Sequence, residues 1–491
     1  MEYNTLAAAD LGSNSFHLAV GRVVDDQVYQ LDSMKETVRL GSGLTEDKRL
    51  DVQAQERAIA ALRRFAERLE GMPRGAVRVV GTNALRVAKN APEFLRRAEK
   101  VLGFPIEVIP GREEARLIYL GVVHSLPLAS HNRLVVDIGG GSTEFIIGNR
   151  LRPKAMESLY MGCVSYTGRF FGDGRIDRKA MKAAELAARE NVETISARFE
   201  REGWREAVGS SGTARSIQDV LLRNGQSTHG ITALGLAWLR DQLVAAGDLR
   251  KVSLPGLRED RVPVLAGGVA IMSGIFAELD VREMTVAEGA LRQGVLWDLL
   301  GRVHHRDIRD VTVEQFAKRY HVDAVQAQRV CSLSQSLLRD LAREDRDLEA
   351  LAPFLDWACR LHEVGISIAQ GAYHKHSAYI LANADMPGFS RQEQARLSTL
   401  VLAQRGGLAK MRGEFEADPL MAELALCLRL AVIFYRARRT LRLPAVRASR
   451  RGRIFRIEID AAWLAERSLI ALALDAERAQ WSSVGLALEL A

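Results

Sequence analysis

One pattern occurs twice in this chain, as DLGSNSFHLAVG at residues 10–21 and as DIGGGSTEFIIG at residues 137–148. Asp, Gly, Ser and Gly recur at the same offsets, and the two copies lie 127 residues apart. Each copy is preceded and followed by an apolar run that is typical of a strand. A single DxG arises easily by chance, but here the strand context recurs as well. The repeat therefore predicts two similar α/β domains that face each other across a cleft.

The sequence around the repeat alternates strand and helix patterns in its first half. Strands are predicted over Thr5–Asp10, His17–Val24, Gln27–Ser33, Val77–Gly81 and Ile106–Ile109, and helices over Val52–Leu69, Pro92–Leu102 and Gly111–Ser125. From about Asp307 the pattern becomes helical, over Val311–Asp340, Leu348–Ile368, Arg391–Leu402 and Met421–Arg439. The last segment, Ala445–Ala491, mixes helix with a strand over Arg453–Asp460.

The composition is that of an ordinary globular protein. A chain of 491 residues is too long for one hydrophobic core, so three or four domains are expected. No apolar stretch is long enough to span a bilayer, and the N-terminus has no secretory pattern. The four cysteines are far apart and form no CxxC pair, which favours reduced, buried thiols and a cytoplasmic location.

The charge balance favours an anionic partner, because the net charge is +7 and the isoelectric point about 9.3. Part of the excess is concentrated between Arg436 and Arg456, where nine arginines occur without one acidic residue. Such a run is either a solvated surface, or a set of partners for acids elsewhere, or a track for a polyanion. The candidate track residues are Arg436, Arg438, Arg439, Arg450, Arg451 and Arg453.

The two repeats contain the residue types that hold phosphate groups. Backbone amides can approach an anion closely where the loop consists of glycine and small hydroxyl residues. The segments Leu11–Ser15 and Ile138–Thr143 both fit this requirement. Each follows a strand that ends in an acid, so each loop is predicted to turn beneath a phosphate.

The acids beside these loops are candidates for a metal site and for a general base. A hard cation such as Mg²⁺ prefers carboxylate oxygens, and Asp137, Glu144 and Asp10 flank the loops. The ordinary alternative for Asp10 and Asp137 is a turn-forming role after a strand. Glu113 and Glu114 begin a helix, where acids also interact with the helix dipole, so either is a candidate base.

Several other motifs remain open between a functional and a structural role. Arg86 ends the segment GTNALR and is either a phosphate ligand or a surface arginine. The glycine clusters Gly209–Thr213 and Leu265–Gly268 either line the cleft or form tight turns. The histidines of the helical region are expected to be core or surface residues, because Glu363 replaces the Asp that a metal-binding His-Asp pair requires.

Taken together, these motifs resemble the exopolyphosphatase / guanosine pentaphosphate phosphohydrolase family, and within it the long bacterial exopolyphosphatases. The resemblance covers almost the whole chain. It rests on DLGSNSFH at 10–17, GTNALR at 81–86, GREEAR at 111–116, DIGGGSTE at 137–144, MGCVS at 161–165, GSSGT at 209–213, LHEVG at 361–365 and HKHSAYIL at 374–381.

The resemblance implies an α/β fold with four domains. Two actin-like (ribonuclease H-like) domains are expected at 1–120 and 121–304, an all-α domain like the His-Asp phosphohydrolases at 305–440, and a small α+β domain at 441–491. It also implies that Glu114 is the base that activates water. Mg²⁺ would be held by Asp137 and Glu144, with Asp10 as a third candidate, and phosphate by Ser13, Asn14, Ser15, Arg86, Gly139, Gly140, Gly141, Ser142 and Thr143.

The function implied is processive, Mg²⁺-dependent hydrolysis of terminal phosphate from inorganic polyphosphate by a homodimer. No nucleic acid partner is expected, and contact with the inner face of a membrane would be peripheral. The sister activity, hydrolysis of guanosine pentaphosphate to the tetraphosphate, shares the same motifs. An ATP-dependent small-molecule kinase uses the same fold and loops. A non-catalytic alarmone sensor is a further alternative, although a pure binder needs no base.

Overall fold

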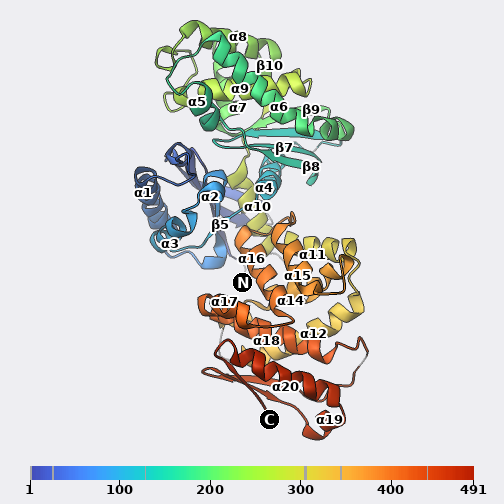
Figure 1. Cartoon of the computed structure of the whole chain (residues 1–491). Coiled ribbons are helices and arrows are strands. Elements are labelled where there is room, and N and C mark those ends of the chain that lie inside the picture. Colours follow the sequence, from blue (N-terminus) through green and yellow to red (C-terminus); the bar gives the residue numbers. More distant parts are fainter. Residues whose placement is uncertain (1–2, 25–26, 128, 304–306, 343–345, 440) are drawn as a thin grey trace. The chain divides into compact units, whose positions relative to one another are not determined.

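The computed structural model describes residues 3–24, 27–127, 129–303, 307–342, 346–439 and 441–491. The chain divides into two compact units, residues 1–308 and residues 309–491 (Figure 1). Each unit is described by itself below. No helix within the described ranges is both long and apolar enough to cross a membrane.

The first unit begins with a five-stranded sheet in the order β3-β2-β1-β4-β5. Neighbouring strands β1, β2 and β3 are antiparallel, whereas β4 and β5 run parallel to β1. The strands are β1 (Thr5–Leu11), β2 (Ser15–Val24), β3 (Gln27–Thr37), β4 (Val77–Gly81) and β5 (Ile106–Val108). The helices of this part are α1 (Val52–Leu69), α2 (Asn83–Val87), α3 (Ala91–Leu102) and α4 (Gly111–His124).

The second sheet repeats this arrangement with one more strand, in the order β10-β11-β9-β6-β7-β8. Its strands β6, β7 and β8 are again neighbours with antiparallel pairing, and β9 runs parallel to β6. The strands are β6 (Arg133–Ile138), β7 (Thr143–Asn149), β8 (Arg152–Leu159), β9 (Glu206–Ser210), β10 (Ile231–Thr232) and β11 (Glu283–Val286). The helices are α5 (Cys163–Phe170), α6 (Arg178–Glu202), α7 (Ser211–Arg223), α8 (Ala233–Ala246), α9 (Val262–Glu278) and α10 (Leu291–Val303).

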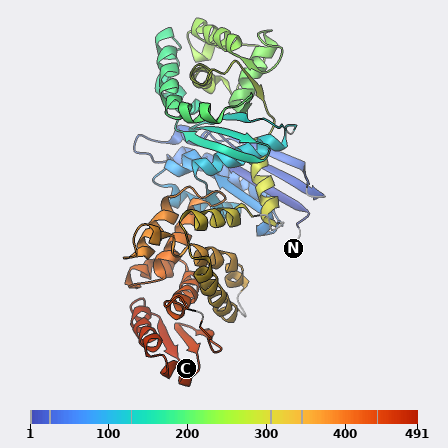
Figure 2. The ribbon, with the colours of Figure 1, turned by 90° about the vertical axis from the view of Figure 1, so that its right-hand side faces the viewer.

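Strands β1 and β6, which come first in the chain in their sheets, are buried on both faces because most of their side chains are apolar. Side chains alternate across a strand, so Ala7 and Ala9 of β1 pack with α1 and α3, whereas Leu6 and Ala8 pack on the opposite face with α4 and α10. Val135 of β6 belongs to this second cluster too. Helices α4 and α10 therefore share one core with the inner faces of both sheets, and Figures 1 and 2 show α10 beside the strands of the first sheet.

The second unit contains helices followed by a three-stranded sheet in the order β12-β13-β14. Its helices are α11 (Ile308–Arg319), α12 (Ala324–Leu341), α13 (Arg346–Glu349), α14 (Ala352–Leu361), α15 (Tyr373–Asn383), α16 (Arg391–Ala403), α17 (Arg412–Ala417), α18 (Pro419–Phe434), α19 (Ala461–Ala465) and α20 (Ser468–Ser482). Its strands are β12 (Arg447–Arg451), β13 (Ile454–Glu458) and β14 (Ala487–Leu490).

The mixed α/β fold of the first half and the helical character after about residue 307 confirm the expected fold class at this level. The segment 311–340 is divided, however, because His321 has a φ of 52° and the side chain of Asp323 accepts from two amides at the start of α12. Residues from 309–440 and from 441–491 share one hydrophobic cluster, with Phe415 and Phe455 both packed on Trp481. The helical part and the final strands therefore form one folded unit.

The chain has one division into compact units, between residues 308 and 309, near the predicted boundary 304/305. The boundary 120/121 lies inside α4. The boundaries 304/305 and 440/441 involve residues outside the described ranges. The four-domain layout stays a prediction.

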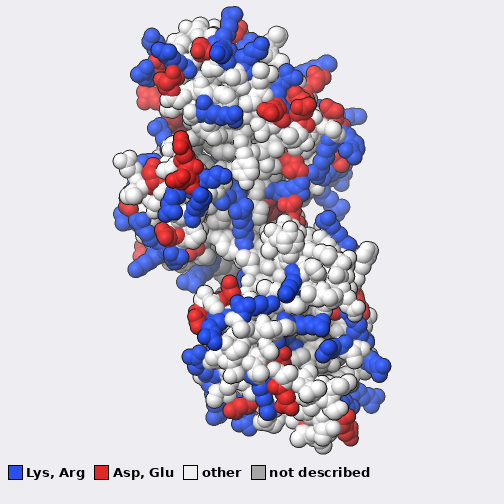
Figure 3. Space-filling view, viewed as in Figure 1, with Lys and Arg blue, Asp and Glu red and all other residues white. Residues whose placement is uncertain are grey.

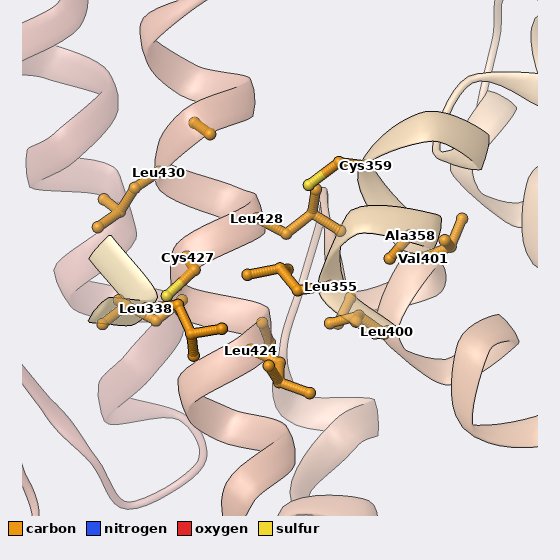
Figure 4. Packing of buried hydrophobic residues seen from close by; sticks show 14 of the residues in the cluster. Leu338, Leu355, Ala358, Cys359, Leu400, Val401, Leu424, Cys427, Leu428 and Leu430 are labelled. Atoms are coloured by element: carbon orange, nitrogen blue, oxygen red, sulfur yellow. The ribbon is translucent and has the colours of Figure 1, made fainter. Parts of the chain in front are cut away.

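The four cysteines are free and buried, as their spacing predicted. Figure 4 shows Cys359 and Cys427 among Leu338, Leu355, Leu424, Leu428 and other apolar side chains of the second unit. Burial raises the pKa of the Cys427 thiol above its ordinary value. Cys359 and Cys427 are therefore core residues of the second unit.

Candidate active site

Asp10 and Asp137, the acids of the two repeated motifs, lie near the carboxyl ends of β1 and β6. They are on the faces of the two sheets that share a core with α4 and α10. Asp10 follows Leu6 and Ala8 at the alternating positions of β1, and Asp137 follows Val135 in β6. Both line one cavity of about 370 Å³ in the first unit. The two equivalent strands thus bring the acids of the sequence repeat to one cavity.

The glycine loops after these strands contact each other at the cavity. A methyl group on Gly140 would lie 3.0 Å from the Cβ of Ser13 and 3.2 Å from the amide nitrogen of Asn14. On Gly141 it would lie 2.4 Å from Oδ1 of Asn83. Only glycine permits this approach, because any side chain would push the loops apart.

Most of the predicted phosphate-binding residues line this cavity. They are Ser13, Asn14, Ser15, Gly139, Gly140, Gly141 and Ser142. Thr143 is not part of the lining. Its fully buried hydroxyl donates instead to the carbonyl oxygen of Met161 at 2.5 Å. Arg86 is also outside the lining, and its guanidinium contacts Glu114 instead.

The neighbouring acids Glu113 and Glu114 have different environments. Glu113 accepts two hydrogen bonds of 2.8 Å from Arg116 and so belongs to a buried ion-pair network. Glu114 lines the cavity. Of the two candidates for the base, the structure thus places only Glu114 where it can reach a ligand.

Glu114 is held in a fixed position. Nη1 of Arg86 donates to the Glu114 carboxylate at 2.5 Å and to the carbonyl oxygen of Ile109 at 3.0 Å. The side chain of Arg86 is 2% exposed, so it is confined to this position. An arginine fixed in this way orients the carboxylate.

Four carboxylates are concentrated around the cavity. Burial, and then the charges of Glu114 and Asp137, raise the pKa of Asp10 well above its ordinary value. Burial first and Glu114 second also raise the pKa of Asp137, to about 6, although the hydroxyls of Ser210 and Ser211 act in the opposite direction. A bound cation would relieve both the burial of these carboxylates and their mutual repulsion.

The fourth carboxylate, Glu144, lies next to the cavity lining and pairs with Asp137 across β6 and β7. Burial, Glu114 and Asp137 raise its pKa, whereas Arg86 lowers it. The hydroxyl of Ser158 donates to Oε1 of Glu144 at 2.8 Å. Ser158 therefore orients Glu144.

The donor set fits a hard divalent cation. Oδ1 of Asp10 is buried and has no hydrogen-bond partner, and carboxylate oxygen is the donor that Mg²⁺ prefers. In the part of the chain that the structure describes, no three His, Cys, Asp or Glu residues converge closely enough to hold a metal by themselves. Mg²⁺ usually keeps several waters and binds phosphate oxygens as well, so one or two carboxylates suffice.

The cluster Gly209–Thr213 fixes the second glycine loop. The hydroxyls of Ser211 and Thr213 both donate to the carbonyl oxygen of Ile138, at 3.0 and 2.9 Å. Ser211 has a φ of 73°, a left-handed conformation that is rare for serine and common at functional sites. The cluster Leu265–Gly268, by contrast, is buried in α9, where Gly267 packs closely on α5.

Five basic residues that were not predicted from the sequence also line the cavity. They are Lys35, Arg215, Arg258, Arg261 and Arg292. They come from four separate segments, and none is part of a phosphate-binding pattern. Only the glycine at position 212 is a local signal, because a side chain there would collide with the Arg261 guanidinium.

In the described part of the second unit, His362 and Glu363 each contact a neighbouring residue. Nδ1 of the buried His362 contacts the carbonyl oxygen of Cys359 at 2.7 Å. Glu363 accepts from Arg438 at 2.5 Å, so the acid in the position of a metal-binding Asp is occupied by an arginine.

The structure separates the predicted arginine track into two groups. Arg438 also pairs with Asp323, Arg450 pairs with Glu423 and lies over the Phe455 ring, and Arg453 donates to the carbonyl oxygen of Gly485. Arg450 is half-buried and the other five candidates are exposed, but among the described residues no ion pair involves Arg436, Arg439 or Arg451. On the face that Figure 3 shows, basic side chains are spread over both parts of the chain, with acidic side chains among them.

Comparison with known proteins places this site in a family. A model of the Ppx/GppA phosphatase family matches residues 19–303, and a model of domain III of Ppx/GppA phosphatases matches residues 308–478. Among solved structures, an exopolyphosphatase from Cytophaga hutchinsonii is 26% identical. The match covers 61% of this chain and 98% of that protein, with a TM-score of 0.56.

A second similar structure is the PPX-GPPA enzyme of Aquifex aeolicus. It is 26% identical, and the match covers 60% of this chain and 98% of that protein with a TM-score of 0.50. The family models together span both units of the chain, which confirms the predicted resemblance. This chain belongs to the Ppx/GppA phosphatase family.

Proposed function

We propose that the chain is an exopolyphosphatase, which hydrolyses the terminal phosphoanhydride bond of inorganic polyphosphate. The observation that supports this most directly is the cavity that joins both glycine loops, the acids Asp10 and Asp137, and Glu114. Phosphoryl transfer needs positioning and charge stabilisation more than covalent chemistry. This cavity contains groups suited to both.

The glycine loops would hold the terminal phosphoryl group. Ser13, Asn14 and Ser15 of the first loop and Gly139–Ser142 of the second lie on the lining. Their small side chains leave backbone and hydroxyl groups close to a bound anion. A phosphoryl group between two loops is restrained from both sides, which favours in-line attack by a water.

Glu114 would accept the proton of the attacking water. Arg86 orients this carboxylate through a hydrogen bond, and a base must be oriented toward the water. Asp10, Asp137 and Glu144 would hold Mg²⁺, which would neutralise charge on the phosphoryl oxygens when bound. Ser158 would keep Glu144 in the orientation for this role.

The finer architecture is part of the same proposal. We assign the two equivalent sheets to actin-like domains and the helices of the second unit to a domain like the His-Asp phosphohydrolases. In that helical part Glu363 is paired with Arg438, which suits a domain that binds polymer without metal chemistry. The exposed Arg436, Arg439 and Arg451 would contact the chain of phosphates.

The test compares phosphate release from long-chain polyphosphate and from guanosine pentaphosphate, with Mg²⁺ and with EDTA. The proposal predicts Mg²⁺-dependent release that is much faster from the polymer. Faster release from the nucleotide would assign the sister activity. No release from either substrate would contradict the hydrolase proposal.

A further inference from the structure

Two of the basic residues in the cavity have no acidic partner. Arg215 lies in α7 and Arg292 in the first turn of α10, and both line the cavity. Within the residues that the structure describes, neither guanidinium forms an ion pair, and Nε of each is buried without a hydrogen-bond partner. Buried donors of this kind require an acceptor, which a ligand can supply.

The other cations of the cavity differ in this respect. Lys35 and Arg258 pair with Asp260 at 2.8 and 2.9 Å, and Arg261 lies 4.0 Å from the same carboxylate. Asp260 thus gives these three side chains an acidic neighbour, although its single charge balances only one of them. Arg215 and Arg292 are the two cations of the lining that lack such an ion pair among the described residues.

The two arginines also repel each other. Burial first, and then the charge of Arg215, lower the pKa of Arg292. Two neighbouring cations that form no ion pair among the described residues are suited to an anion, because an anion relieves both the repulsion and the unmet hydrogen bonds.

The contacts of Arg292 and Arg215 fix their orientation. Nη1 of Arg292 lies 3.2 Å from Nδ1 of His17, and burial followed by the charge of Arg292 lowers the pKa of His17 to about 3. His17 is therefore neutral at physiological pH and accepts from the arginine. Nη2 of Arg215 donates to the carbonyl oxygen of Glu288 at 2.9 Å.

The arginine pair lies beside the carboxylate centre. His17 is the direct cross-strand neighbour of Asp10 in β1 and β2, and Arg292 contacts His17. Asp10, His17 and Arg292 all line the cavity, so Arg292 lies next to the carboxylates. A ligand that extends beyond the glycine loops toward this side would meet the two guanidinium groups.

We propose that Arg215 and Arg292 form a second anion subsite, which binds the phosphoryl group next to the one that is removed. The inference rests on the proposed function, in which the glycine loops hold the terminal phosphoryl group. It requires a substrate with at least two consecutive phosphoryl groups. Because this neighbouring phosphoryl group leaves with the shortened chain, the two arginines also stabilise the negative charge that develops on it.

The experiment measures binding of tripolyphosphate and orthophosphate by calorimetry in chains that carry Glu114→Gln, so that the ligand is not consumed. Adding Arg292→Gln or Arg215→Gln is expected to weaken tripolyphosphate binding about tenfold or more, the usual effect of losing a hydrogen bond to a charged group. Orthophosphate binding should be unchanged, which also shows that the variant is folded. The matched control is Arg223→Gln, an exposed arginine at the end of the same helix α7.

Unchanged tripolyphosphate binding in both arginine variants would overturn the subsite, even if the natural chain releases phosphate from polyphosphate. An equal loss of orthophosphate and tripolyphosphate binding would also overturn it, because the arginines would then serve the terminal phosphate. If the natural chain releases no phosphate, the hydrolase proposal fails, and the calorimetry still decides whether this pair binds a polyanion.

Discussion

Among single residues, Arg86 has the clearest task, since it touches the proposed base and is itself fixed by the carbonyl oxygen of Ile109. Arg86→Lys keeps the charge but removes the guanidinium nitrogen Nη1 that makes both contacts. We expect kcat to fall about 100-fold, because a misplaced catalytic group costs that much. Steady-state phosphate release measures this effect.

The control for this variant is Arg97→Lys, which alters an exposed ion pair with Glu56 in the first unit. Its rate should equal that of the natural chain, because exposed pairs contribute little. A natural rate in Arg86→Lys would show that Glu114 needs no such support.

Ser158 tests the proposed metal site through its hydrogen bond to Glu144. Partners that orient a metal ligand typically change metal affinity 10–100-fold when removed. Ser158→Ala should therefore raise the Mg²⁺ concentration needed for half-maximal activity by about tenfold, with the maximal rate restored at high Mg²⁺. A Mg²⁺ dependence identical to that of the natural chain would exclude Glu144 as a ligand oriented by Ser158.

Between elements, one buried ion network joins β4, α4 and α10. Asp298 of α10 contacts Arg78 at 2.6 Å, Arg302 at 3.0 Å and also Arg116, which in turn holds Glu113. Burial disfavours the charged form of Asp298, but Arg116, Arg78 and Arg302 together hold its pKa well below the usual range. The network explains why Glu113 is structural whereas its neighbour lines the cavity.

Asp298→Asn should destabilise the first unit by about 3–5 kcal/mol at neutral pH, because it leaves buried arginines without their acid. A lowered pKa in the folded state stabilises the fold above the unfolded value of about 3.9 and loses that effect as the pH falls below it. The difference from the natural chain should therefore shrink below about pH 4.

Hydrogen exchange of the amides in β4 and α4 measures this difference, because it reports on the first unit alone. Asp241→Asn, which alters an exposed pair with Arg240, is the control and should change the exchange by less than about 1 kcal/mol. An effect of Asp298→Asn no larger than the control, or one that does not vary with pH, would contradict the role of the network.

The sequence predicted the elements with a strong local pattern and the residues that directly follow them. β4 and α1 have the predicted bounds, and Asp10 and Asp137 lie together because the repeat reflects two equivalent sheets. Thr143 fits the loop pattern equally well, but its hydroxyl is bonded to Met161. The local pattern does not determine which side of a loop a hydroxyl faces.

Other parts of the site depend on contacts between distant segments. Ser158 and Arg292 have no phosphate-binding motif around them, and Arg215 only follows the GSSGT cluster at 209–213. All three acquire their proposed roles only when β8, α7 and α10 pack around the repeat. Strand β12 was not predicted, because the arginine run was interpreted only by its charge. It forms since Ala448 is buried and the strand pairs with β13.

At the scale of the whole molecule, the second unit is proposed to bind the polymer that the first unit hydrolyses. Replacing the exposed Arg436, Arg439 and Arg451 by Gln should slow phosphate release from long-chain polyphosphate, with a weaker salt dependence, because contacts between exposed charges are screened by salt. Release from tripolyphosphate should be unchanged. Kinetics on both substrates at two salt concentrations provide the measurement.

The matched control replaces three exposed arginines of the same unit outside this run, Arg319, Arg339 and Arg478. It should leave both rates as in the natural chain. An equal slowing in the two triple variants would assign the effect to net charge, and equal slowing on both substrates would contradict a separate track.

Glu114 is proposed to activate water in a cavity whose other residues bind the phosphate. The most direct measurement compares the natural chain with Glu114→Gln in phosphate release from long-chain polyphosphate and in polyphosphate binding, both with Mg²⁺. In Glu114→Gln, phosphate release is expected to fall by about 100-fold or more, since general-base catalysis contributes 10²–10⁴-fold. Polyphosphate binding is expected to be retained. Release at the natural rate in Glu114→Gln would show that another group activates the water.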